Sequence, residues 1–378
     1  DVSAIADTGS IINGVGSTMN ISATNLRLTA GDAIATNARH LTTTVDTLSA
    51  LSTGTGTDTD TNNAGTFITE TDNLTIGSVA VSVTHMNSDA STLVITDAAQ
   101  SGLTTLSNNG DILLSTVNGA IVIDQGVVAQ GAGHILVAAN GSDNDLTVNA
   151  DINSSTGHIT LMAADAINVN ADILTASSGS ISIDAQGSDL LMAGSSNITA
   201  TESSVRLQAA NNITLGNISA MDVSVIANAG SIINGVGSTM NISATNLRLA
   251  ADDAIAISER HLTTSVDTLS ALSTGIDNAG IFITETDNLT VGSVALSVTQ
   301  VNADATSSII SDAAQSGLTT LNTHGDIVLS TVNGAIVINQ GVVAQGAGNI
   351  LLAANGSDND LTVNADIDSS TGHITLTA

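Results

Sequence analysis

The sequence predicts an all-β protein, a parallel β-helix (β-solenoid) with about three short strands in each coil of about 22–24 residues. Three observations lead to this fold class: a long internal repeat, a shorter regular spacing of apolar residues within it, and a core composition almost without aromatic side chains. By length alone, 378 residues would suggest two or three globular domains. The repeat pattern instead indicates one continuous array.

The long repeat divides the chain into residues 1–221 and 222–378. Ser10 to Leu28 is identical to Ser231 to Leu249, so that Asp222 in the second copy corresponds to Asp1 in the first. A six-residue difference in the segment TGTDTDTN, after Gly54, shifts this register, so that Ser330 then corresponds to Ser115. Self-similarity at a fixed period is the sequence signature of repeat architectures. We therefore expect 1–221 to be a first complete long repeat of one solenoid, and 222–378 to be a second, truncated one.

A finer period lies inside the long one. A motif of two apolar residues separated by one other residue recurs at short and nearly regular intervals. Further short runs of the same kind, such as Ile167-Asn-Val169, lie between these motifs. This gives about three strands of about 3–5 residues in each coil. The motifs begin at Ile112, Ile135, Ile159, Ile181, Val205, Val223 and Leu247.

Strands this short are not stable alone or in a hairpin. They become stable when each coil stacks on the previous one at about 4.8 Å, so that every strand pairs with its copies above and below and no hairpin is needed. We expect Ile159 and Leu161 to point into the core, and Thr160 and Asn168 to face water. Gly, Ser, Asn and Asp supply the corners. The whole chain would make about 15–17 coils and a rod of about 75 Å.

The composition fits a thin stacked core. Phe67 and Phe282 are the only aromatic residues of the Phe, Trp and Tyr types, and the chain has no Pro or Cys. A net charge of −30 raises the alternative of disorder, but 42% hydrophobic residues with regular spacing favour an ordered chain. The acidity argues against nucleic-acid binding, which needs Lys and Arg. No apolar run approaches the length of about 20 residues that a membrane-spanning helix needs, so we expect no membrane insertion.

Two segments fit the coil pattern less well. The stretch HLTTTVDTLSALSTG from His40, and its copy from His261, have apolar residues spaced V-x-x-L-x-x-L. This spacing allows one helical turn or, as the favoured interpretation, a coil with a wider bend. The segment TGTDTDTN around Asp58 has no counterpart in the second copy. We expect it to form a surface excursion, since insertions into a solenoid point outward.

Coils such as GHITLMAADAINVNADILTASSGSISIDA (Gly157 to Ala185) resemble the repeats of filamentous-haemagglutinin-like adhesins and of other giant repetitive surface proteins of Gram-negative bacteria. The resemblance covers nearly the whole chain and rests on a G-x-I-x-L-x-A rhythm. It implies a right-handed parallel β-helix, export across the outer membrane, and a role in adhesion, biofilm or a cell-surface filament.

Candidate catalytic groups are sparse, and we expect no enzyme activity. The chain lacks Cys and Lys, and no G-x-S-x-G motif occurs. His134 and His158 are separated by about one coil length, and each comes directly before a motif Ile. They are expected to stack on adjacent coils, either as ordinary corner residues or, with further ligands, as a metal site.

No cofactor is expected apart from a weak case for calcium. The acidic pairs follow Asn-Gly-Ser and resemble fragments of calcium loops, although no full EF-hand spacing is present. Asx turns at coil corners are the alternative interpretation. The candidate metal ligands are Asp143, Asp145, Asp358 and Asp360.

The sequence therefore predicts the structural repeat region of an extracellular fibre or adhesin on the bacterial cell surface, acting as a stiff stalk or filament shaft. Its expected partners are neighbouring repeats or subunits, through self-association at the open coil ends. The alternative is a binding module for glycans or divalent cations on the side of the solenoid, in a groove formed by residues 40–65 and their copy.

Overall fold

The computed structural model describes residues 1–378 except 55–64, 108, 276–278 and 322. The chain is an all-β parallel β-solenoid of about 15 turns, and none of the described residues is helical. The predicted fold class is therefore confirmed. The chain groups into two compact units, residues 1–164 with 301–308 and residues 165–300 with 309–378. This grouping reflects packing, and the predicted repeat boundaries stay a prediction.

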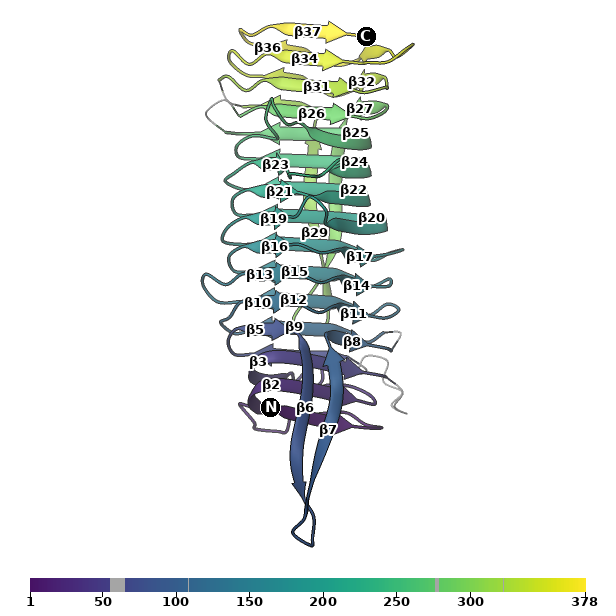
Figure 1. Ribbon diagram of the computed structural model, residues 1–378. Coiled ribbons are helices and arrows are strands. Elements are labelled where there is room, and N and C mark those ends of the chain that lie inside the picture. Colours follow the sequence, from purple (N-terminus) through teal and green to yellow (C-terminus); the bar gives the residue numbers. More distant parts are fainter. Residues whose placement is uncertain (55–64, 108, 276–278, 322) are drawn as a thin grey trace. The chain divides into compact units, whose positions relative to one another are not determined.

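The strands of the first unit follow one another round the coils in chain order (Figure 1). They are β1 (Val2–Ala6), β2 (Ile21–Ala30), β3 (Leu41–Ser52), β4 (Thr66–Glu70), β5 (Leu74–Ile76), β6 (Ser78–Met86), β7 (Thr92–Ser101), β8 (Leu103–Thr105), β9 (Ile112–Thr116), β10 (Ile121–Ile123), β11 (Val127–Ala129), β12 (Ile135–Ala139), β13 (Leu146–Val148), β14 (Ile152–Ser154) and β15 (Ile159–Ala163).

The second unit repeats this organisation. Its coil strands are β16 (Ile167–Val169), β17 (Ile173–Thr175), β18 (Ile181–Ala185), β19 (Leu190–Met192), β20 (Asn197–Ala209), β21 (Ile213–Leu215), β22 (Asn217–Ala227), β23 (Ile232–Asn234), β24 (Ile242–Ala251), β25 (Leu262–Ser273), β26 (Ile281–Glu285), β27 (Leu289–Val291), β30 (Leu318–Thr320), β31 (Ile327–Thr331), β32 (Ile336–Ile338), β33 (Val342–Ala344), β34 (Ile350–Ala353), β35 (Leu361–Val363), β36 (Ile367–Ser369) and β37 (Ile374–Thr377). The remaining strands, β28 (Ser293–Val301) and β29 (Ser307–Ser316), form a hairpin.

The predicted motif spacing is the register of the parallel ladder. In the first unit Ile112 pairs with Ile135, and Ile135 with Ile159. In the second unit Val205 pairs with Val223, although this interval is the shortest between successive motifs. The shorter coil is possible because β22 runs from one side of the coil to the next without a turn. The paired residues are fully buried, so the core is a column of aliphatic side chains repeated coil after coil.

The two segments with V-x-x-L-x-x-L spacing are strands, so the helical alternative is wrong and the wider coil is correct. Strands β3 and β25 are each 12 residues long and alternate between buried and less buried positions. Each pairs in parallel with three successive strands, β3 with β4, β5 and β8. A strand that bends round the corners of a coil needs no turn there. The segment TGTDTDTN lies outside the described residues.

The short coil strands need no hairpin, as predicted, but the described chain also contains two hairpins that the sequence analysis did not predict. Strands β6 and β7 pair as an antiparallel hairpin, and their copies β28 and β29 also pair with each other. Each hairpin leaves its coil between two glycines, Gly77 and Gly102 in the first case, and the N–H of Gly102 donates to the C=O of Gly77 at 3.0 Å. Gly102 has φ +73°, and a Cβ there would lie 2.2 Å from the C=O oxygen of Gly126. The arms are strands of 9 and 10 residues, long enough to form a ladder of their own.

Thr160 does not face water as predicted, because the tip of the second hairpin covers it. The side chain of Thr160 is fully buried, and its Oγ1 accepts a hydrogen bond from the N–H of Val301 at 2.8 Å. Asn168 lies at a partly exposed position of β16, as expected for a residue that points outward. The outward side of a strand is therefore exposed only where no hairpin lies over it.

Candidate functional site

The candidate calcium ligands lie in two equivalent turns, one in each unit. Asp143 and Asp145 belong to the turn between β12 and β13, and Asp358 and Asp360 to the turn between β34 and β35. Asp143 has φ 60° and Asp358 has φ 61°, a left-handed conformation that Asp tolerates better than most residues. The Asx-turn alternative, like calcium binding, stays a prediction.

An asparagine holds each of these turns from within. Asn144 Nδ2 donates to the C=O of Asn140 at 2.8 Å and to Oδ1 of Asn118 on the preceding coil at 3.0 Å. Asn359 makes the matching bond to the C=O of Asn355 at 2.7 Å. Among the described residues, no group of three or more His, Asp or Glu side chains is arranged to hold a metal ion. Calcium binding stays a prediction.

The turn interpretation has a direct test at Asp143. Replacing Asp143 by valine should destabilise the first unit by about 1–2 kcal/mol, because a β-branched residue is strained at positive φ. Replacing it by asparagine should leave the melting temperature unchanged, since asparagine tolerates the same conformation. Thermal unfolding followed by circular dichroism, without added calcium, measures both. A clear destabilisation by the asparagine variant would instead show that the carboxylate is needed.

The two predicted histidines do stack on adjacent coils, as members of a backbone ladder. The rings of His134 and His158 have centroids 5.0 Å apart. Oδ1 of Asp111 accepts from the N–H of His134 at 2.7 Å, and Nδ1 of His134 accepts from the N–H of His158 at 3.0 Å. Burial, and then an electrostatic interaction with His134, lowers the pKa of His158 to about 4. In the second unit Asn349 replaces His134 and its Oδ1 accepts from the N–H of His373 at 3.0 Å.

Each acceptor in this ladder bonds to the N–H of the corresponding corner residue on the next coil. Asn349 performs this role in the second unit, so an acceptor side chain at this position supports the coil stack in both units. Asp189 makes the same kind of bond to the N–H of Asn212 at 2.8 Å. Asp, Asn and His at the corners therefore contribute to the coil stack itself. A hollow of about 350 Å³ beside Asp111 and His134 is also lined by Asp304 at the tip of the second hairpin.

A fully buried glutamate occupies the same coil corner in both units, and the sequence analysis did not single it out. Oε2 of Glu70 accepts from Thr43 Oγ1 at 2.6 Å, and its Oε1 accepts from the N–H of Val45 at 3.2 Å. Glu285 receives the matching bond from Thr264 Oγ1 at 2.7 Å. The N–H groups of Val45 and Val266 bond to these glutamates at the bends of β3 and β25. Each glutamate carboxyl group therefore takes the place of a ladder partner at the bend.

Burial raises the pKa of Glu70, and it raises the pKa of Glu285 to about 7. A hydrogen bond with the Asp287 carboxyl also raises the pKa of Glu285. The sequence contains the signal for this site. In the strand I-F-I-T-E, the alternation that points Ile281 and Ile283 inward also points Glu285 inward.

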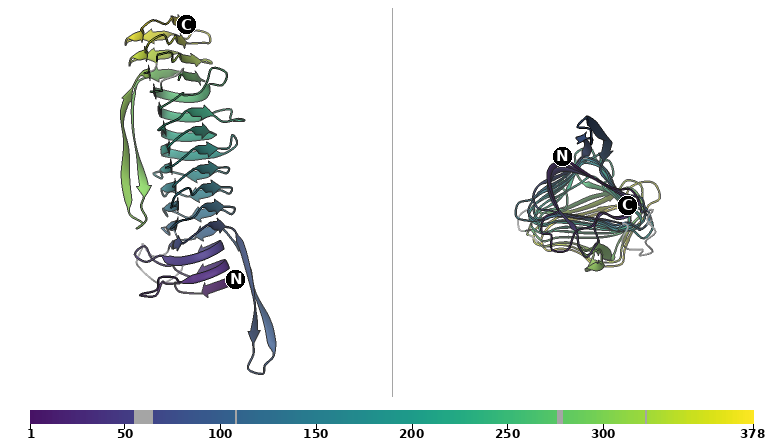
Figure 2. Two further views of the ribbon diagram at one scale, coloured as in Figure 1. Left: turned by 90° about the vertical axis from the view of Figure 1, so that its left-hand side faces the viewer. Right: turned by 90° about the horizontal axis from the view of Figure 1, so that it is seen from below.

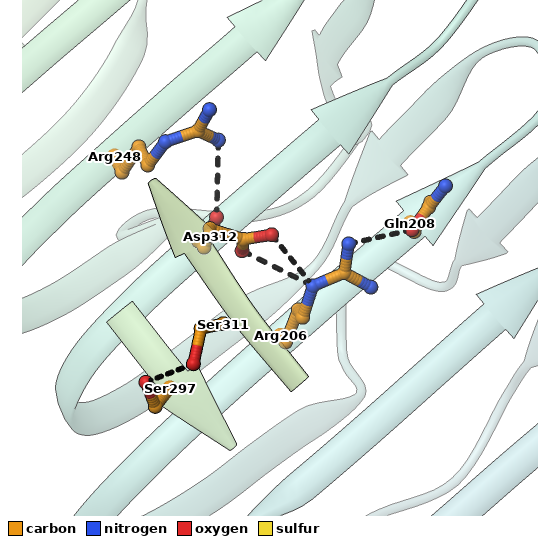
Figure 3. A network of polar contacts seen from close by, with 7 residues as sticks. Arg206, Gln208, Arg248, Ser297, Ser311 and Asp312 are labelled. Atoms are coloured by element: carbon orange, nitrogen blue, oxygen red, sulfur yellow. Dashed lines mark hydrogen bonds and ion pairs between the residues drawn. The ribbon is translucent and has the colours of Figure 1, made fainter. Parts of the chain in front are cut away.

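The interface between a hairpin and the coil side in the second unit contains a buried ion pair and several further polar contacts. Nε of Arg206 lies 3.0 Å from Oδ1 and 3.1 Å from Oδ2 of Asp312 on β29, and the side chains are 9% and 7% exposed (Figure 3). The Arg206 guanidinium also donates to Oε1 of Gln208 at 2.6 Å. Arg248, two coils further on, is attracted by the charge of Asp312 and donates to Ser224 Oγ at 3.4 Å. One carboxylate therefore faces two guanidinium groups.

Further contacts fix this hairpin along the coils. Gln315 Nε2 donates to the C=O of Leu249 at 2.8 Å. Ser180 Oγ donates to the C=O of Thr299 at 3.0 Å. Val298 on β28 is only 2% exposed. Hairpin β28–β29 therefore lies flat against the coils of the second unit (Figure 2).

The first hairpin makes the corresponding contacts only near its base. Gln100 Nε2 donates to the C=O of Leu28 at 2.9 Å, in the same way as Gln315 does to Leu249. Arg27 Nε donates to the C=O of Ala98 at 3.3 Å. Beyond these contacts, β6 and β7 extend past the first coils (Figure 1).

No protein family, curated protein or solved structure matches the chain with significance. No helix among the described residues is long and apolar enough to cross a membrane. The fold and its interfaces define a β-solenoid repeat protein whose coil sides carry docked hairpins.

Proposed function

We propose that this chain is a shaft segment of an extracellular fibre or adhesin on a bacterial cell surface, a stiff and non-catalytic spacer. The observation that carries the proposal is the repetition of one construction. In each unit the buried aliphatic residues pair with one another in register, and turns held by Asp, Asn and Gly close the coils. Such a stack resists bending, because every backbone ladder runs along the array.

The polar contacts support a structural role. The corner carboxylates and amides, the buried glutamates and the Arg206–Asp312 pair all bond to other parts of the coil stack. A net charge of −30 keeps such a shaft soluble and repels it from other acidic surfaces. Self-association into a fibre through neighbouring repeats completes the proposal. Binding of glycans or divalent cations on the coil side stays the alternative.

Electron microscopy tests the shaft directly. A chain in which residues 1–221 are duplicated ahead of Asp1 should form thin rods longer than those of the original chain by about 40 Å, since the added repeat contributes about nine coils at about 4.8 Å each. The original 378-residue chain is the control. Compact particles whose diameter grows in all directions would contradict the proposal.

A further inference from the structure

The two hairpins have closely similar sequences but very different surroundings. Val298 and Val301 on β28 are 2% and 1% exposed. Their counterparts on β6 in the repeat register are Val83 and Met86, which are 51% and 72% exposed. All four side chains are apolar. The two hairpins therefore differ in whether other parts of the protein cover these side chains.

The bases of the hairpins provide an internal control. Val79 and Val81 on β6 are each 2% exposed, and their counterparts Val294 and Leu296 are 2% and 3% exposed. Both hairpins therefore begin against the coils in the same way. They differ only beyond the base, where β6–β7 extends past the described coils and β28–β29 does not (Figure 2).

The two hairpins also differ in their charged contacts. Asp312 on β29 pairs with Arg206. For its counterpart Asp97 on β7, no ion pair is found among the described residues. Because Asp222 corresponds to Asp1, the counterpart of Arg206 falls upstream of Asp1.

We propose that β6–β7 is a strap for a preceding long repeat, and that it binds coils with the sequence of residues 160–221. The segment carries three groups to which the second hairpin bonds beyond its base. Thr160 receives the N–H of Val301, Ser180 bonds to Thr299, and Arg206 pairs with Asp312.

Charge complementarity favours this occupant. The chain has 5 basic residues against 35 acidic ones, so most of its surface repels a hairpin that carries Asp97. The segment 160–221 offers a guanidinium at the matching position, and its outward-facing Thr160 and Ser182 are 0% and 1% exposed where the second hairpin covers the coils. The strap goes beyond the shaft function, since it would join neighbouring repeats whatever the array is used for.

The experiment compares hydrogen exchange of the β6–β7 amides in three proteins. The first is the 378-residue chain, and the second is the same chain extended ahead of Asp1 by a copy of its own residues 160–221. The third carries a complete duplicate of residues 1–221 at that point, so that the added coils occur in a context in which they already fold. In both extended proteins, exchange of the outer half of the adjacent β6–β7 should slow at least 10-fold.

Asp97→Asn provides the specific variant. It should abolish most of the added protection in the extended proteins and leave exchange in the original chain unchanged. Hairpin β28–β29 in the same molecules reports that the coils have folded. If β28–β29 is protected while β6–β7 exchanges as fast in both extended proteins as in the original chain, the proposal is wrong. Protection that appears in the original chain as its concentration rises would also overturn it, since a second copy would then be the occupant.

Discussion

Replacing Asp312 by asparagine should release hairpin β28–β29 from the coils of the second unit. Arg206 and Arg248 would then face each other across one coil without an anion between them. Removing one partner of a buried ion pair typically costs about 3–5 kcal/mol, because the remaining charge stays desolvated. Asparagine keeps one acceptor for Arg206 Nε, so we expect a loss of about 3 kcal/mol. Hydrogen exchange of the β28 and β29 amides measures the release.

The chain contains a matched control for this variant. Asp97→Asn makes the same chemical change at the counterpart position, where no ion pair is found among the described residues, and it should leave the free energy of unfolding nearly unchanged. Asp312→Asn combined with Arg206→Gln removes both members of the pair and should recover part of the loss. Equal effects of Asp312→Asn and Asp97→Asn would show that the ion pair does not hold the hairpin.

The coil architecture was predictable because the spacing of apolar residues along the sequence equals the length of one coil. The interval from Ile135 to Ile159 is both a sequence period and a ladder register. The hairpins were missed although the spacing contains their signal. Thr66 pairs with Ile112, and the interval between them is about twice the usual coil length. The surplus corresponds to Ser78–Ser101, whose first strand places Val79, Val81 and Val83 at alternate positions.

The candidate sites were less predictable, because their partners are remote in sequence. Asp312 is 106 positions from Arg206, and Val301 is 141 positions from Thr160. No local period relates such pairs, so the burial of Thr160 follows only from the hairpin's course. The stacking of His134 and His158 at the coil corner was easier to predict, since the two residues are one coil apart in the sequence. Glu285 was predictable in principle from strand alternation, but a buried carboxyl contradicts the usual expectation that Glu faces solvent.

Glu285 should make the stability of the second unit depend on pH. Its pKa is raised from 4.5 to about 7 in the folded chain, because burial disfavours the charged form. A carboxyl whose pKa is higher in the folded than in the unfolded state binds a proton more tightly when folded. Its contribution is therefore fully present below about pH 4.5, is lost as the pH rises to about 7, and does not change further above that. The raised pKa amounts to about 3 kcal/mol over this range.

Glu285→Gln isolates this contribution, because the amide is neutral at every pH and can still donate to Asp287. The unfolding free energy of the variant, measured by chemical denaturation from pH 4.5 to pH 8, should decrease less than that of the unaltered chain, and the remaining decrease includes the contribution of Glu70, whose pKa burial also raises. At pH 8 the variant should be at least as stable as the unaltered chain, since it avoids a buried charge. Glu259→Gln, at an exposed position, is the control and should keep the full decrease. A decrease of unchanged size in Glu285→Gln would assign the titration to another group, and the neutral form of Glu285 would then not be what holds the bend of β25.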